Sequence, residues 1–362
     1  MDNKVYINGL GCVSPQNTTD WTTPVCYDTN QLRCIDPGYK EFIPAESFRR
    51  MGRVIKMGVA AAKLCIKDAA NAIEYKDNAE ITPDGIITGT GLGCMEDTEK
   101  FLASMIKNNE EFLTPTSFIQ STHNTVAGQI ALLLKCHGYN FTFVHRGISF
   151  ESALLDAMMQ IQSGTLDNVL AGASDELTSG SFTIMSRLGF WKQKPIRSMD
   201  LLIDQQRGTI AGEGATFFFL GKNKNEHTYA SVDAVSTFLK PVNDLEIIDR
   251  LRDFLTSNSM EIKDIDLVFM GLNGDPQTDK IYHLMANTAL DKTPQAYFKH
   301  LCGEFHTASA YATWLSATIL KTQTIPEFLR TNDVQTHKSI NKILIYNHFR
   351  ENNHAFILLS RP

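Results

Sequence analysis

The sequence NFTFVHRGISFESALLDAMMQIQSG at residues 140–164 predicts three elements in direct succession. The apolar run over 140–144 is typical of a strand, 145–148 of a turn, and 149–163 of a helix that stops at a glycine. The helix carries one apolar stripe at helical spacing, made of Phe150, Leu154, Ala157 and Ile161. A strand that opens through a tight turn into a helix is the building unit of sheets covered by helices.

The same order of elements returns in the second half of the chain. Residues 296–320, AYFKHLCGEFHTASAYATWLSATIL, predict a strand over 296–301, a turn over 302–305 and a helix over 307–320. The flanking apolar strands also correspond: 84–91 with 265–274, 168–174 with 342–349, and 215–221 with 354–360. Such an internal repeat indicates two copies of one β/α unit.

The other predicted elements lie in the first half. They are a strand over 4–15, an irregular polar segment over 16–45, helices over 49–73 and 95–107, and a helix that follows Asn124. The first of these helices contains small residues that predict close packing against another element, namely Gly58, Ala60, Ala61 and Ala62.

Strands that are apolar on both faces need a layer of helices on each side. We therefore predict an α/β fold with α-β-α-β-α layers, in which two similar halves, 1–222 and 223–362, share their small-residue helices in the middle. The turns at 145–148 and 302–305 then come near the loop at 271–276. We expect the functional site there, because ligand sites in such folds gather where strands end.

The composition excludes several classes of protein. With 362 residues, 43% of them hydrophobic and 20% charged, the chain is neither disordered, collagen-like nor a coiled coil. A net charge of −6 argues against a nucleic-acid-binding surface. No apolar run approaches the roughly 20 residues that span a bilayer, and the start lacks a signal-peptide pattern. Seven scattered cysteines without a CxxC pair indicate free thiols and a cytoplasmic location.

Six stretches in this order resemble the β-ketoacyl synthases, the condensing enzymes of the thiolase-like fold. They are INGLGCVSP at 7–15, RRMGRVIKMGVAAA at 49–62, GIITGTGLG at 85–93, NTVAGQIAL at 124–132, GTIAGEGA at 208–215 and KHLCGEFHTASA at 299–310. The resemblance covers most of the chain. It implies a thiolase-like, five-layer fold of two similar halves, in agreement with the internal repeat.

In that family a cysteine nucleophile lies at the strand-to-helix turn of the first half, and the second half supplies a lysine and two histidines. Cysteine suits this position because a helix N-terminus lowers the pKa of the thiol, and histidines suit theirs because they donate hydrogen bonds to an enolate. Counted back from NVLAGASDE at 168–176, the cysteine position falls on Gly147. The nucleophile position is therefore vacant.

The positions in the second half also depart from the family pattern. The first histidine falls on Asn273 or Leu272, the lysine is kept as Lys299, and the second histidine falls on Glu304. The family's glycine-rich C-terminal loop is replaced by NHFRENN at 347–353. A carboxylate about 4 Å from an enolate would oppose its formation by roughly 4 kcal/mol at an effective dielectric near 20. The resemblance thus implies that this chain does not perform the usual condensation alone.

What the resemblance implies is a ketosynthase-like subunit without the Cys-His-His set, similar to a chain length factor that pairs with an active ketosynthase. It looks most like the small members of bacterial aryl-polyene or flexirubin-type pigment pathways. The implied partners are an active ketosynthase or a second copy of the chain, and an acyl carrier protein in fatty acid or polyketide biosynthesis. No cofactor, metal, nucleic acid or membrane is expected. Residues 112–119 are candidates for the wall of an acyl tunnel.

Two other functions stay open. An acyltransferase, thioesterase or decarboxylase of the same fold would use His145, Ser149, Glu304 or His306, with Ser149 and His145 as a serine–histidine pair. A serine at a helix start, however, more commonly caps the helix. The third function is a homodimer that binds acyl groups or carrier proteins without catalysis.

Several further features have a structural explanation beside a functional one. Cys94 and Cys302 are candidate nucleophiles but also ordinary buried thiols, and Cys302 with His306 has a metal-ligand spacing without further ligands. The glycines of GTGLG at 89–93 are better explained by close packing than by a nucleotide loop. A basic helical face that would meet an acidic carrier protein or solvent is formed by Arg49, Arg50, Arg53 and Lys56.

Overall fold

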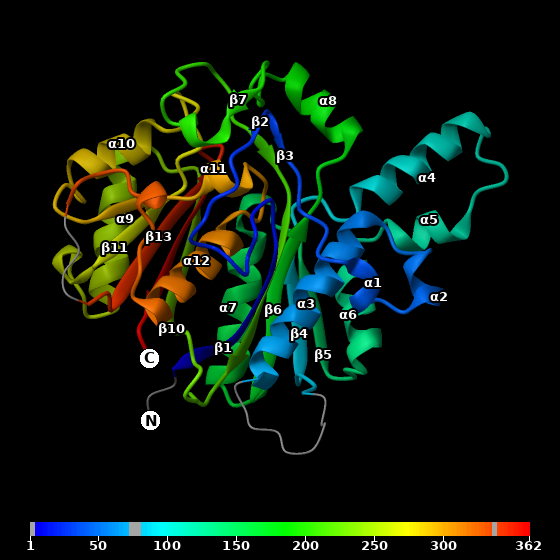
Figure 1. The fold of residues 1–362 in the computed structure, drawn as a ribbon, viewed down its shortest axis with the longest axis horizontal. Helices are drawn as coiled ribbons and strands as arrows, with labels where there is room; N and C mark the ends of the chain where they lie inside the picture. The colour runs from blue at the N-terminus through cyan, green and yellow to red at the C-terminus, as the bar shows by residue number, and fades with distance from the viewer. Residues whose placement is uncertain (1–3, 72–80, 335–338) are drawn as a thin grey trace.

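The computed structural model describes residues 4–71, 81–334 and 339–362. Its main feature is a ten-stranded mixed sheet in the order β12-β11-β13-β14-β10-β1-β9-β6-β4-β5 (Figure 1). These strands are β1 Val5–Val13, β4 Gly85–Gly89, β5 Tyr139–Phe143, β6 Asn168–Asp175, β9 Gly214–Gly221, β10 Ala230–Leu239, β11 Leu267–Met270, β12 Gln295–Tyr297, β13 Lys342–Phe349 and β14 Asn353–Ser360. Two short pairs lie outside it: β2 Asp28–Thr29 with β7 Ile196–Arg197, and β3 Gln31–Leu32 with β8 Ala211–Gly212.

The sheet consists of two halves with the same strand order. The first half runs β5-β4-β6-β9-β1 and the second β12-β11-β13-β14-β10. In each half, the strand that comes first in the sequence, β1 or β10, lies next to the other half. The strand that comes third in the sequence, β5 or β12, forms the outer edge of the sheet. A short antiparallel pairing of β1 with β10, from Val5 and Val232 to Ile7 and Ala230, joins the halves. This common order confirms the predicted repeat.

The helices form three layers around the two half-sheets (Figure 1). The α-helices are α1 Tyr39–Phe42, α2 Ala45–Phe48, α3 Arg53–Asn71, α4 Met95–Lys107, α5 Pro115–Gln120, α6 Thr125–Leu134, α7 Ser149–Gln162, α8 Ser179–Arg187, α9 Asp244–Ser257, α10 Lys280–Asn287, α11 Lys299–Cys302 and α12 Ser309–Thr322. Short 3-10 helices are η1 Arg146–Ile148, η2 Ser198–Asp200, η3 Ile262–Asp264 and η4 Glu327–Leu329. Helices α7 and α12 pack in the central core, α3 and α6 cover the first half, and α9 and α10 cover the second. The layered thiolase-like fold is thereby confirmed.

Helix α3 packs against β1 as closely as its small residues predicted. A Cβ atom on Gly11 of β1 would overlap the backbone oxygen of Ala61 and would lie 2.8 Å from the Cβ of Cys65. Only glycine fits there, because any side chain would push the helix away from the sheet.

Some predicted elements differ from the observed ones. The strand expected over 296–301 is β12 only as far as Tyr297, because its partner β11 ends at Met270, and the chain then turns into α11. Strand β10 and helix α9 were not predicted. β10 is half-buried along much of its length, so its polar and apolar residues do not form a continuous apolar run.

The expected basic face does not form as one surface. The guanidinium of Arg53 forms an ion pair with the buried carboxylate of Glu213, and the ammonium of Lys56 lies 4.2 Å from the ring centroid of Phe48. Arg49 and Arg50 precede α3 and are exposed. Arg53 is therefore a structural residue.

The division expected at residues 222/223 falls in the connection between β9 and β10 and stays a prediction. In the described ranges, none of the helices combines the length and the apolar character that crossing a membrane requires.

Candidate functional site

The turn between β5 and α7 places Gly147 at the N-terminal end of the central helix. The hydroxyl of Ser149 accepts a hydrogen bond from the His145 N–H at 2.8 Å and donates one to the carbonyl of Arg146 at 2.7 Å. Arg146 has a φ of 53°, a left-handed conformation that reverses the chain in a short distance. Gly147 is buried at this turn, which is where the resemblance assigns the nucleophile.

The space beside Gly147 is already occupied. A Cβ atom built on Gly147 would overlap the Cβ of Phe349 and lie 3.3 Å from that of Asn353. Phe349 ends β13, and its ring stacks on the imidazole of His306 with 4.3 Å between the centroids. Any side chain at position 147 therefore requires Phe349 to move.

Asn273, Lys299 and Glu304 come together in one buried group. The Lys299 ammonium is 2.7 Å from Oε2 of Glu304, and the Asn273 side-chain amide donates to the same oxygen at 2.9 Å. The backbone of Glu304 is held by the 208–215 segment: its N–H donates to the Ile210 carbonyl at 2.8 Å, and its carbonyl accepts from the Gly212 N–H at 3.0 Å. Three positions that the sequence matched to the family thus share one hydrogen-bond network.

The loop after β11 presents Asn273 to this network. The backbone N–H groups of Asn273 and Gly274 both donate to the carboxylate of Asp279, at 3.0 Å and 2.8 Å. Leu272, the other candidate for this position, belongs to the apolar core around α9 and α10. Asn273 is therefore the residue that reaches Glu304.

Ser149 and His145 do not form a serine–histidine pair. Nδ1 of His145 lies 2.9 Å from the hydroxyl of Ser152, whereas the Ser149 hydroxyl is engaged by the backbone of the turn. The capping expectation for Ser149 is also wrong, because Ile148 is the N-cap residue of α7, no side chain caps the helix, and the Ser149 hydroxyl binds the backbone of the preceding turn.

The other candidate nucleophiles and ligands are buried. Burial raises the pKa values of the Cys94 and Cys302 thiols, which leaves both uncharged and poorly nucleophilic at neutral pH. Burial also lowers the pKa of His306, against the opposing charge of Asp175. Over the described ranges, no cluster of three or more histidine, cysteine, aspartate or glutamate residues could hold a metal ion.

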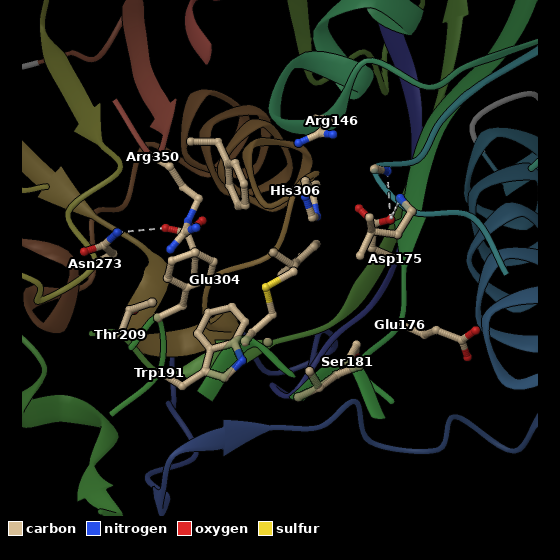
Figure 2. A pocket seen from close by; sticks show the side chains of 18 of the residues that line it. Arg146, Asp175, Glu176, Ser181, Trp191, Thr209, Asn273, Glu304, His306 and Arg350 are labelled. Carbon is tan, nitrogen blue, oxygen red and sulfur yellow. Dashed lines mark hydrogen bonds between the residues drawn. The ribbon is translucent and has the colours of Figure 1, made fainter. Parts of the chain in front are cut away.

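A cavity of about 660 Å³ opens beside these residues (Figure 2). Glu304, Asn273 and His306 line it, together with apolar and aromatic residues from α8 and the segment after it, among them Met185, Leu188, Phe190 and Trp191. On another wall, Asp175 accepts hydrogen bonds from the Thr90 hydroxyl at 2.8 Å and the Thr307 hydroxyl at 2.9 Å. This carboxylate therefore ties the two halves of the chain together beside the cavity.

Sequence reasoning missed several residues of this cavity. Phe349 and Arg350 lie in the 347–353 segment, which was noted only as a departure from the family loop. Trp191 and Thr209 carry no local pattern that points to a site, because α8 and the 190–209 segment reach the cavity only through the folding of the chain.

Glu151 is a further buried carboxyl near the site. It lies on the first turn of α7 and is 0% exposed. Burial raises the pKa of this carboxyl to about 7, and the charge of Lys299 opposes the shift only in part. At neutral pH the protein thus holds a carboxyl whose ionisation the fold disfavours.

We predict that Glu151→Gln stabilises the protein at high pH. Because the pKa of Glu151 is raised in the fold, its contribution to stability is complete below the ordinary glutamate pKa of 4.5 and is lost as the pH rises through about 7. Glutamine cannot ionise, so the gain in the free energy of unfolding should be larger at pH 8 than at pH 4.5 by roughly 3 kcal/mol. Urea unfolding at both pH values measures it, with the exposed Glu111→Gln as control. A gain that does not change with pH would contradict the prediction.

The family model described as Beta-ketoacyl synthase, N-terminal domain, matches residues 22–226. No curated protein sequence matches the chain.

Three solved structures are similar over nearly their whole length. The ishigamide ketosynthase/chain length factor has a TM-score of 0.78 at 19% identity, over 99% of both chains. A beta-ketoacyl synthase from Burkholderia phymatum STM815 has a TM-score of 0.78 at 16% identity, also over 99% of both. The ketosynthase ApeO in complex with its chain length factor ApeC, from Xenorhabdus doucetiae, has a TM-score of 0.78 at 15% identity, over 99% of this chain and 98% of that one. At these identities the likeness concerns the fold.

Proposed function

Because this chain belongs to the β-ketoacyl synthase family, we propose that it is a subunit without the Cys-His-His chemistry, and that it pairs with an active ketosynthase as a chain length factor does. The observation that carries this proposal is the contact between Gly147 and Phe349. The position matched to the nucleophile has no side chain, and Phe349 occupies the space that the Cβ of a cysteine would need. A subunit that shapes a partner's acyl tunnel needs apolar bulk there and no reactive group.

The group around Glu304 supports the same proposal. Enolate formation needs hydrogen-bond donors directed at the developing negative charge. Lys299 neutralises Glu304, but Oε1 of Glu304 remains an acceptor beside the cavity, and Oε2 already takes up the Lys299 and Asn273 donors. The hydrogen-bond donors of Lys299 and Asn273 are thus bound to Glu304, whereas condensation would require donors directed at the enolate.

One edge of the molecule is suited to a partner subunit. Strand β5 pairs with β4 on one side only, and its other edge has no strand partner among the described residues. Exposed apolar side chains surround this edge on β5, on the residue after it, and on α6 and α7: Phe141, Val144, Leu132, Leu155 and Met159. An unpaired edge strand next to exposed apolar side chains favours association with another chain.

The arm formed by α4 and α5 continues this surface. Figure 1 shows both helices extending from the body on the side of β5 and α6. Within the stretch 112–119, Phe112, Phe118 and Ile119 are exposed, so they are not core residues of the isolated chain. Ile119 and Leu132 line one surface groove, which makes the arm continuous with the β5 edge. We propose that this surface contacts the ketosynthase, with 112–119 near its acyl tunnel.

Co-expression tests the proposed pairing. The chain is tagged and produced with each cysteine-bearing ketosynthase of its own genome, and we expect one of them to co-purify in a one-to-one complex. Phe141→Lys should abolish the complex, because it places a charge in an apolar interface. Leu245→Lys on α9 is the matched control: Leu245 is 64% exposed against 47% for Phe141, and it lies away from the β5 edge.

Two results would overturn the proposal. One is carbon–carbon bond formation from acyl and malonyl thioesters by the purified chain alone. The other is the absence of a complex with every ketosynthase tested. A carrier-protein partner, a polyketide or polyene pathway and a cytoplasmic location belong to the same proposal.

A further inference from the structure

Three residues that line the cavity each have a buried polar atom without a hydrogen-bond partner among the described residues. These atoms are Nε1 of Trp191, the hydroxyl of Thr209 and Oε1 of Glu304. Buried polar groups in folded proteins are nearly always paired, so an unpaired one needs an explanation such as a ligand or water. Their residues belong to separate segments yet line one cavity, and the atoms include a donor, a hydroxyl and an acceptor.

Arg350 adds a cation to the same cavity. It lies at the tip of the β13–β14 hairpin, half-buried, with its guanidinium over the ring of Phe190. Within the described part of the chain, no carboxylate forms an ion pair with it and no acceptor binds its N–H groups. Burial lowers its pKa to about 10, against the opposing charges of Glu304 and Asp275, so the guanidinium remains charged at neutral pH.

The carboxylates of the cavity already have partners of their own. Glu304 pairs with Lys299, and Asp275 pairs with Arg207 at 2.9 Å. Asp175 accepts from two hydroxyls and from the N–H of Gly91 at 2.9 Å. The positive charges that are left to meet a ligand are therefore those of Arg350, seen beside Glu304 in Figure 2, and of Arg146, which also lines the cavity.

We propose that this cavity binds a free hydrophobic carboxylic acid that carries a hydroxyl group close to its carboxylate. The carboxylate meets the guanidinium of Arg350 and the indole N–H of Trp191, and the hydroxyl donates to Oε1 of Glu304. The apolar chain lies along Met185, Leu188 and Phe190. A volume of about 660 Å³ accommodates such a molecule, since ligand cavities range over about 300–1,000 Å³. The inference goes beyond the proposed function, because it requires neither a thioester nor a partner subunit.

Calorimetry on the full-length chain tests this assignment. The ligands are 3-hydroxydodecanoate, dodecanoate, dodecane-1,3-diol and dodecyl phosphate. We expect the hydroxy acid to bind most tightly and dodecanoate to bind several-fold more weakly than the hydroxy acid. The diol should bind more weakly than the hydroxy acid by a factor of about ten or more, because it lacks the negative charge. Binding should quench tryptophan fluorescence, and Trp191→Phe should remove most of that signal.

Variants separate the charge of Arg350 from its packing. Arg350→Gln should lower the affinity for the hydroxy acid by a factor of about ten or more and leave the affinity for the diol unchanged. The affinity of Arg350→Lys for the hydroxy acid should lie between those of the parent and Arg350→Gln. Arg252→Gln on the exposed face of α9 is the control and should change nothing. Equal affinity for the diol and the acid, tighter binding of dodecyl phosphate, or an unchanged affinity in Arg350→Gln would each overturn the assignment. Ketosynthase co-purification does not depend on any of these results.

Discussion

Replacing Gly147 with cysteine yields a protein that is less stable than its parent and whose new thiol forms no acyl thioester. The cysteine Cβ would overlap Phe349, and overpacking of this kind costs about 1–3 kcal/mol. The thiol would lie at the N-terminus of α7, a position that favours the reactive thiolate. This chain therefore differs from an active condensing enzyme in two ways: position 147 lacks a sulfur, and Phe349 blocks a side chain at that position.

Room for the thiol should come from removing the whole Phe349 side chain, because its Cβ is the atom that a Cβ at position 147 would overlap. In Gly147→Cys with Phe349→Gly, we expect the thiol to react with an acyl thioester, and we expect the two changes to destabilise the protein by about 1–3 kcal/mol less than the sum of the single variants. Mass spectrometry measures acylation, and urea unfolding measures the coupling. Cys26, the exposed cysteine, is first replaced by serine.

The control for this experiment is Gly128→Cys. A Cβ on Gly128 would meet no atom within 4 Å, so this variant should fold like the parent and react freely with a small alkylating reagent. A Gly147→Cys protein that is as stable as the parent and accepts an acyl group would contradict the prediction. It would mean that Phe349 does not close the position.

The second large effect is expected at the Lys299–Glu304 pair. Lys299 is 0% exposed, so Glu304→Gln leaves its ammonium charge inside the protein without the carboxylate with which it forms its ion pair. Breaking a buried pair in this way costs about 3–5 kcal/mol. The double variant Lys299→Met with Glu304→Gln should recover most of this loss, because neither side chain is then charged and the volumes are similar.

Urea unfolding of the two single variants and the double variant measures these energies. Lys222→Met removes one partner of an exposed ion pair with Asp167 and should change the free energy of unfolding by less than about 1 kcal/mol. If Glu304→Gln is as stable as the parent, the Lys299 charge is solvated in some other way and the proposed network is wrong.

The predicted site positions differ in how well local sequence could place them. Lys299, Gly303 and Glu304 belong to one block, and Gly147 follows from its distance to β6, so their places in the fold could be worked out along the chain. The choice between Asn273 and Leu272 could not, because it depends on the hydrogen bonds from the loop to Asp279. The pairing of Ser149 with His145 failed for a similar reason, since the turn uses the serine hydroxyl for its own backbone.

By itself, the order of apolar runs and glycines determined the repeated β/α unit, the central helices and the family resemblance, because these patterns record which faces must be buried. Tertiary structure alone decided that Phe349 occupies the space beside Gly147, that Arg53 turns inward to Glu213, and that Trp191, Thr209 and Arg350 share a cavity with Glu304. Contacts of this kind join residues far apart in the chain. No periodicity within a segment encodes them, since they arise only when separate elements pack against one another.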